Sequence, residues 1–107
     1  DFEVEKTLVG DISGISPIDV PPYQLLERII GEMYPQAVVL PYLMAGGTDS
    51  RKYAGVCDKI YRFSAMVLDP QEYASIHSTN ERISIENLAS IIEFYCRFLS
   101  AYDYKNM

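Results

Sequence analysis

Histidine, cysteine and tryptophan are scarce in this chain. Its 107 residues include one histidine, two cysteines and no tryptophan. The cysteines, Cys57 and Cys96, form neither a CxxC pair nor the dense framework of a disulfide-rich domain. We expect two buried free thiols, which are typical of a reducing cytoplasm, although export stays open.

Basic residues and long apolar runs are also few. Nine Lys and Arg residues stand against 15 Asp and Glu residues, a net charge of -6. This charge argues against a sequence-independent nucleic-acid binder, because no basic surface would neutralise phosphates. The longest apolar runs, residues 37–40 and 42–45, are far too short to cross a bilayer. We expect no signal peptide at the start of the chain, and because it starts at Asp1 we expect its natural N-terminus to be missing.

The residues that are abundant suit a folded domain. Hydrophobic residues make up 49% of the chain and charged residues 22%, unlike the composition of a disordered tail. At this length a single domain can bury a core without disulfides. The nine tyrosines are expected to pack their rings while their hydroxyls find water or a partner.

Four helical segments are expected. A helix capped by Asp19 should end before Pro35, and its apolar residues recur at a spacing of three and four: Leu25, Leu26, Ile29, Ile30 and Met33. Residues 48–54 predict a short helix, and residues 69–72 predict a helical turn. Ser84 should cap a last helix with an apolar face made of Ile85, Leu88, Ile91, Ile92, Tyr95 and Leu99.

Three strands are expected between these helices. Partial alternation predicts an edge strand over residues 2–12, and the apolar run at 37–40 is typical of a buried parallel strand. Residues 59–63 alternate in the same manner. Strands that alternate with amphipathic helices predict an α/β fold with parallel pairing. The break around residues 13–22 is the best candidate domain boundary, because the first strand fits poorly with the α/β run after it.

The segment GGTDSR at residues 46–51 is one candidate binding site. Its two glycines would let the backbone come close to a ligand, and Thr48 with the next amide groups could face an anion. Arg51 could hold a carboxylate with two parallel hydrogen bonds. The GxxxxGK[ST] loop of nucleotide enzymes is absent. A plain glycine turn with a capping side chain and an exposed arginine fits the pattern equally well.

His77 is the other candidate. A solitary imidazole is either an ordinary surface side chain or one ligand of a metal site completed by residues outside this chain. Glu81 and Arg82 precede a helix, where an acid also suits the positive end of the helix dipole. Spacing alone supports no Ser-His-Asp or Cys-His arrangement.

Four motifs together carry a resemblance to a known family. They are VVLPY at 38–42, GGTDSR at 46–51, CDKIYRFS at 57–64 and IHSTNERISIENL at 76–88. In order and spacing the chain, from about residue 2 to 102, resembles the C-terminal part of the di-zinc peptidases and amidohydrolases. This family includes aminoacylases, Gly-X carboxypeptidases and succinyl-diaminopimelate desuccinylases, and the resemblance is strongest to its carboxypeptidase S branch.

The resemblance implies an architecture. Residues 17–107 would be the C-terminal segment of a zinc-exopeptidase-like catalytic domain, a partial αβα layer. Residues 1–16 would be the end of a lid domain, a remnant strand.

It also implies roles for single residues. His77 matches the late histidine among the ligands of two zinc ions, and Asn80, Glu81 and Arg82 would surround it. Gly47, Thr48 and Arg51 fall where the family binds the free carboxylate of the substrate. The general-base glutamate of the family has no counterpart here, so the chain contains no catalytic residue. Ser78 replaces a common glycine and Ala65 a common proline, which are mild departures.

The implied function is that of a hydrolase fragment. The intact protein would cleave the amide bond of peptides or N-acyl amino acids with a free carboxylate, through a metal-activated water. The chain alone would be inactive without the missing N-terminal half of its catalytic domain. The alternative is a stand-alone binding or oligomerisation module. We expect the chain to self-associate, most simply as a two-fold dimer, through the strand edge at 37–40, the exposed helix faces or the strand at 2–12.

Overall fold

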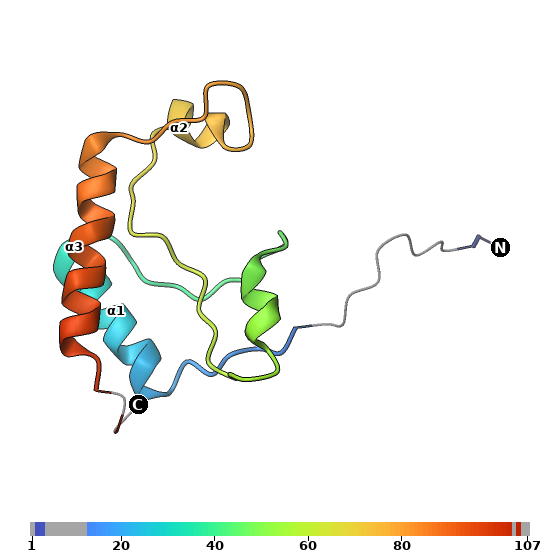
Figure 1. Cartoon of the computed structure of the whole chain (residues 1–107), viewed down its shortest axis with the longest axis vertical. Coiled ribbons are helices and arrows are strands. Elements are labelled where there is room, and N and C mark those ends of the chain that lie inside the picture. The colour runs from blue at the N-terminus through green and yellow to red at the C-terminus, as the bar shows by residue number, and fades with distance from the viewer. Residues whose placement is uncertain (1, 4–12, 104, 106–107) are drawn as a thin grey trace.

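In a computed structural model of the chain, residues 2–3, 13–103 and 105 are described. Over these residues the elements run in the order α1 (Pro21–Met33), the 3-10 helix η1 (Asp49–Tyr53), α2 (Pro70–Ser75) and α3 (Ile85–Ala101). Figure 1 shows α1 and α3 side by side, with α2 at the far end of α3 and η1, in green, standing apart from both.

Helix α1 forms where the sequence predicts it, although its start is capped differently. Val20 is the N-cap and no side chain caps the helix, so the expected cap by Asp19 is wrong. Proline occupies the first two helical positions, where a missing N–H costs nothing and the fixed φ suits the helix. Four residues of the predicted apolar face are buried, namely Leu25, Leu26, Ile29 and Ile30. The fifth, Met33, packs at their edge.

The core lies between α1, α3 and the segment that contains Ala65. Ile29 is 1% exposed, Ala65 1% and Phe94 3%, which makes these three the centre of a small cluster. Rings extend the cluster: the Phe63 and Phe94 ring centroids lie 5.1 Å apart, a distance typical of favourable aromatic pairs. The pairing of α1 with α3 is therefore held by apolar contact around one row of side chains.

Helix α3 is capped as predicted but packs through a different face. Ser84 accepts a hydrogen bond from the Asn87 backbone N–H at 3.1 Å. The inward row, at helical spacing, is Asn87, Ile91, Phe94 and Phe98. Of the predicted face only Ile91 packs inward, and five residues are exposed: Ile85, Leu88, Ile92, Tyr95 and Leu99. The prediction was wrong because α3 is apolar on two sides, and only a tertiary partner selects one of them.

The predicted α/β fold is wrong for the part of the chain that the structure describes, which is helical and contains no strand. Residues 37–40 and 59–63 run between helices without a ladder of backbone hydrogen bonds, so neither forms a strand or an αβα layer. The strand expected over 2–12, read as a lid remnant, lies largely outside the described residues. Apolar alternation is compatible with an extended chain, but a strand also needs a neighbouring backbone to pair with.

Side chains replace the missing ladder along residues 59–67. The Ser16 hydroxyl donates to the Ile60 carbonyl and accepts from the Ile60 N–H, both at 2.9 Å. The Asn87 side chain makes the same pair of bonds with Val67, at 2.8 and 2.9 Å. The segment is thus fastened near both ends by polar side chains from other parts of the chain.

Ser16 and Pro17 contact the segment that contains Ile60 and Tyr61. Besides the Ser16 bonds, the Tyr61 hydroxyl donates to the Pro17 carbonyl at 2.6 Å. The division into a lid remnant at 1–16 and a catalytic segment at 17–107 stays a prediction.

Cys57 and Cys96 are free thiols, as expected, but both are exposed rather than buried. Within the described residues no helix combines the length and apolar character needed to cross a membrane.

Candidate functional site

Thr48 organises the turn at residues 46–51. As the N-cap of η1 its hydroxyl accepts from the Ser50 backbone N–H at 3.2 Å, and it also bonds the Ser50 hydroxyl. A capping Thr is the local reason that the chain turns into a helix here. The short helix expected at 48–54 is thereby confirmed.

Gly47 and Arg51 lie on the solvent side of this turn. Neither Gly46 nor Gly47 has a positive φ, and a Cβ added at either would meet open space. The turn itself therefore does not require glycine, and the backbone beside it is open to approach from outside. Arg51 is exposed, and within the described part of the chain it forms no ion pair.

Arg62 reaches the same turn from the segment at 57–64. Its Nε–H donates to the Ser50 hydroxyl at 2.7 Å and to the Thr48 hydroxyl at 3.3 Å. The sequence places Arg62 within the strand predicted over residues 59–63, with no functional role. The sign that could have marked it is a single guanidinium between the ring residues Tyr61 and Phe63, where burial makes a charge costly.

His77 lies in the loop between α2 and α3. Helix α2 begins with a capping box, in which Asp69 accepts from the Gln71 and Glu72 N–H groups and Glu72 accepts from the Asp69 N–H. Glu72 also accepts from the Ser84 N–H at 2.9 Å. One carboxylate therefore ties the start of α2 to the start of α3 and closes the base of the loop.

Two residues of this loop have left-handed backbones. The φ angles are 58° at His77 and 62° at Asn80, and both side chains are exposed. Such angles are uncommon for residues other than glycine, although asparagine and histidine tolerate them best. Arg82 steadies the far side of the loop, since its N–H donates to the Ser75 hydroxyl and its Nη1 to the Asn80 carbonyl.

The predicted site residues fall into two separate groups. Gly47, Thr48 and Arg51 belong to the turn at η1, whereas His77 and residues 80–82 belong to the loop after α2. Figure 1 shows the loop at the outer end of α2, away from the green 3-10 helix. The structure of this chain alone does not bring the two groups together.

A metal centre does not fit the described residues by themselves. No group of three or more His, Cys, Asp or Glu side chains lies close enough among them to hold an ion. A catalytic zinc takes about three protein ligands. His77 offers one nitrogen, so the donor set among the described residues is incomplete.

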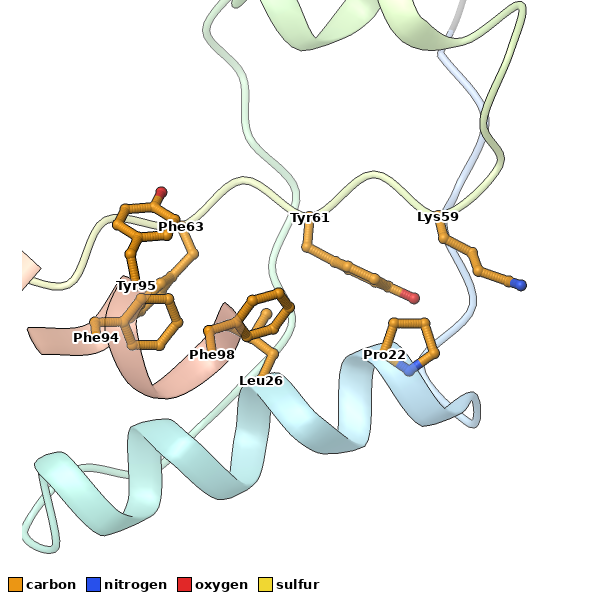
Figure 2. Close-up of a pocket in the computed structure, with 8 residues that line it drawn as sticks. All are labelled: Pro22, Leu26, Lys59, Tyr61, Phe63, Phe94, Tyr95 and Phe98. Carbon is orange, nitrogen blue, oxygen red and sulfur yellow. The ribbon is translucent and has the colours of Figure 1, made fainter. Parts of the chain in front are cut away.

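An aromatic pocket of about 220 Å³ opens beside the core (Figure 2). Tyr61, Phe63 and Phe98 line it, with Lys59 at one end. Burial, and then the Asp58 carboxylate, raise the pKa of the Tyr61 phenol. The Tyr61 hydroxyl donates to the Pro17 carbonyl at 2.6 Å.

Comparisons with known proteins identify the family. The model of "Peptidase family M20/M25/M40" matches residues 1–101. An N-fatty-acyl-amino acid synthase/hydrolase PM20D1 of Bos taurus is 38% identical over 113 residues, covering 92% of this chain and 22% of the relative. PM20D1.1 of Danio rerio is 33% identical, covering 96% of this chain and 21% of the relative. Carboxypeptidase S of Saccharomyces cerevisiae is 26% identical, covering 90% and 18%.

The chain spans about a fifth of the length of the PM20D1 relatives it matches. No solved structure matches it. The resemblance to the peptidase and amidohydrolase family that the sequence predicts is confirmed. Peptidases of this family are generally metal-dependent hydrolases, and by the match over residues 1–101 this chain belongs to peptidase family M20/M25/M40.

Proposed function

We propose that the protein carrying this chain hydrolyses the amide bond of peptides or N-acyl amino acids that have a free carboxylate. The observation that carries the proposal is the turn at η1. Arg51 is an exposed arginine that forms no ion pair among the described residues, and it belongs to the same turn as Thr48 and the open backbone of Gly47. A guanidinium with adjacent hydroxyl and amide donors is well suited to a carboxylate. Relatives named for carboxypeptidase S and for N-fatty-acyl-amino acid hydrolysis support the substrate class.

The metal of the proposal is zinc, and His77 is the residue of this chain that would bind it. The remaining ligands and the general base would come from outside the described residues, among which no group of three or more possible metal ligands lies together. Asn80, Glu81 and Arg82 would orient the loop that carries the imidazole. We accordingly propose that the chain by itself is inactive.

A non-catalytic role as a binding or oligomerisation module is the second candidate. The exposed apolar row on α3 favours it, because such rows are usually covered by a partner. The two candidates differ in whether the full-length protein turns over a substrate.

A cytoplasmic location is also proposed, on the presence of two free thiols.

The test uses the full-length protein with N-acetyl-L-leucine and its amide as a matched pair. Arg51→Ala should weaken the preference for the acid over the amide by roughly 10-fold or more, since a charge-assisted contact contributes about 1.5–3 kcal/mol. Arg28→Ala is the control, because Arg28 pairs with Glu32 on the exposed side of α1. His77→Ala should abolish turnover. Absence of hydrolysis by the full-length wild type with zinc would leave the module as the better reading.

A further inference from the structure

Arg62 is a half-buried guanidinium without a carboxylate partner in the part of the chain that the structure describes. Arg28 and Arg97, both largely exposed, form ion pairs with Glu32 and Glu93. Arg62 is more enclosed than either and forms none among the described residues. Taking a guanidinium out of water without an anion costs free energy. A half-buried arginine without a carboxylate partner among the described residues points to an anionic ligand.

The hydrogen bonds of Arg62 use its Nε–H and leave the terminal N–H groups of the guanidinium for a ligand. The Nε–H is used by the hydroxyls of Ser50 and Thr48, at 2.7 and 3.3 Å. A guanidinium has five N–H donors, and the hydrogen bonds that Arg62 forms with the described residues both use its Nε–H. Two terminal N–H groups in one plane match the two oxygens of a carboxylate.

The surroundings of Arg62 suit the rest of a small organic acid. The residue lines a cavity of about 260 Å³ together with apolar side chains that include Leu40, Tyr42, Met44 and Ile60. Ligand pockets combine a mostly apolar wall with a few placed polar groups. A carboxylate at the guanidinium would therefore leave apolar wall for an acyl or side-chain group.

We propose that Arg62 is a specificity-determining residue that recognises the carboxylate of the substrate. Its Nε–H holds the Thr48 and Ser50 hydroxyls in place, and its terminal N–H groups bind the carboxylate. The identity of the ligand rests on the proposed function, whereas the role of Arg62 as an anion-recognising group rests on its own contacts.

Calorimetric titration of the full-length protein tests this with N-acetyl-L-leucine and N-acetyl-L-leucine amide as probes. We expect the wild type to bind the acid in preference to the amide. Arg62→Met should lower that preference about 10-fold or more, the size expected for one charge-assisted contact. Arg62→Lys, which keeps the charge but loses the planar fork, should fall between the two. Arg28→Met is the matched control, because it removes an equal charge from a paired, exposed site.

Ser50→Ala provides a second variant that keeps the guanidinium. It removes one acceptor of Nε, and we expect a partial loss of acid preference. The Nε–H resonance of Arg62, identified by its disappearance in Arg62→Lys, should shift with the acid and not with the amide. If Arg62→Met fails to fold, the acid preference of Ser50→Ala and the shift of the Nε–H resonance still test whether Arg62 binds the carboxylate.

The outcomes separate this inference from the proposed function. If Arg62→Met weakened the binding of the acid and of the amide equally, Arg62 would only support packing. That result would overturn the inference and leave the proposed hydrolysis intact. Arg62-dependent acid binding without turnover would overturn the proposed hydrolysis and keep the inference. No binding of the acid by the wild type would overturn both.

Discussion

Asn87 of α3 bonds both backbone groups of Val67, accepting from its N–H at 2.8 Å and donating to its carbonyl at 2.9 Å. A side-chain amide thus makes the pair of bonds that a neighbouring strand would make. Asn87 is 7% exposed, so these bonds are shielded from water. The contact ties the last helix to the segment that contributes Ala65 to the core.

Replacing Asn87 should destabilise the fold. Asn87→Ala leaves the Val67 N–H and carbonyl without their partner, and we expect a loss of about 1–3 kcal/mol of unfolding free energy. Asn87→Asp should cost more at neutral pH, because it places a carboxylate near Glu72, which now accepts from Asn87 Nδ2 at 3.5 Å. Urea unfolding followed by circular dichroism measures both, with Ser100→Ala on the exposed side of α3 as control. A change below about 0.5 kcal/mol, typical of surface sites, would contradict this.

Tyr61 should make the stability fall at alkaline pH. Its pKa is raised above the ordinary value of 10.0, first by burial and then by Asp58, so the folded state holds the phenolic proton more tightly than the unfolded state. The contribution of the protonated Tyr61 phenol to the free energy of unfolding is fully present below about pH 10. It is lost as the pH rises through the pKa of Tyr61 in the folded state. Tyr61→Phe should remove this part of the pH dependence.

The same variant also tests the hydrogen bond to Pro17. At pH 7, Tyr61→Phe should lower the unfolding free energy by about 0.5–1.5 kcal/mol, since a neutral hydrogen bond is lost. Tyr53→Phe is the control, because Tyr53 is 61% exposed. An identical alkaline decline in the wild type and in Tyr61→Phe would show that another group causes it.

The left-handed backbone at Asn80 predicts an order of stability among substitutions there. With φ at 62°, Asn80→Ala should be less stable than Asn80→Gly by roughly 1 kcal/mol, because a Cβ is disfavoured in this region. Thr79→Ala and Thr79→Gly form the control pair, since Thr79 has no positive φ. At this position Thr79→Gly should be no more stable than Thr79→Ala, because glycine adds freedom to the unfolded chain. Thermal unfolding of the four variants gives the comparison.

Self-association of the chain remains a proposal, and the exposed row on α3 indicates where to look. Leu88 and Ile92 lie one turn apart on that row, exposed by 50% and 57%. Sedimentation equilibrium at micromolar concentration should show a dimer for the wild type. Leu88→Glu with Ile92→Glu should give a monomer, because two buried carboxylates at a two-fold contact would be costly. Val56→Glu, at an exposed position outside the row, is the control. A monomeric wild type would contradict the proposal.

Local sequence was enough to locate the helices. Thr48, Asp69 and Ser84 each cap a helix through bonds to residues two or three positions away, so their role depends on nothing distant. Membership of the peptidase family could also be inferred from motif order alone, since that order does not depend on the packing.

Tertiary structure decided everything that depends on distant partners. It selected the Phe94 side of α3 over the Leu88 side, although both are apolar. It satisfied the backbone of residues 59–67 with Ser16 and Asn87 instead of a sheet, and it joined Arg62 to Ser50. Periodicity states which side chains share a face, but the free energy of burial depends on what covers that face. For the same reason, an extended pattern does not become a strand until a second backbone lies beside it.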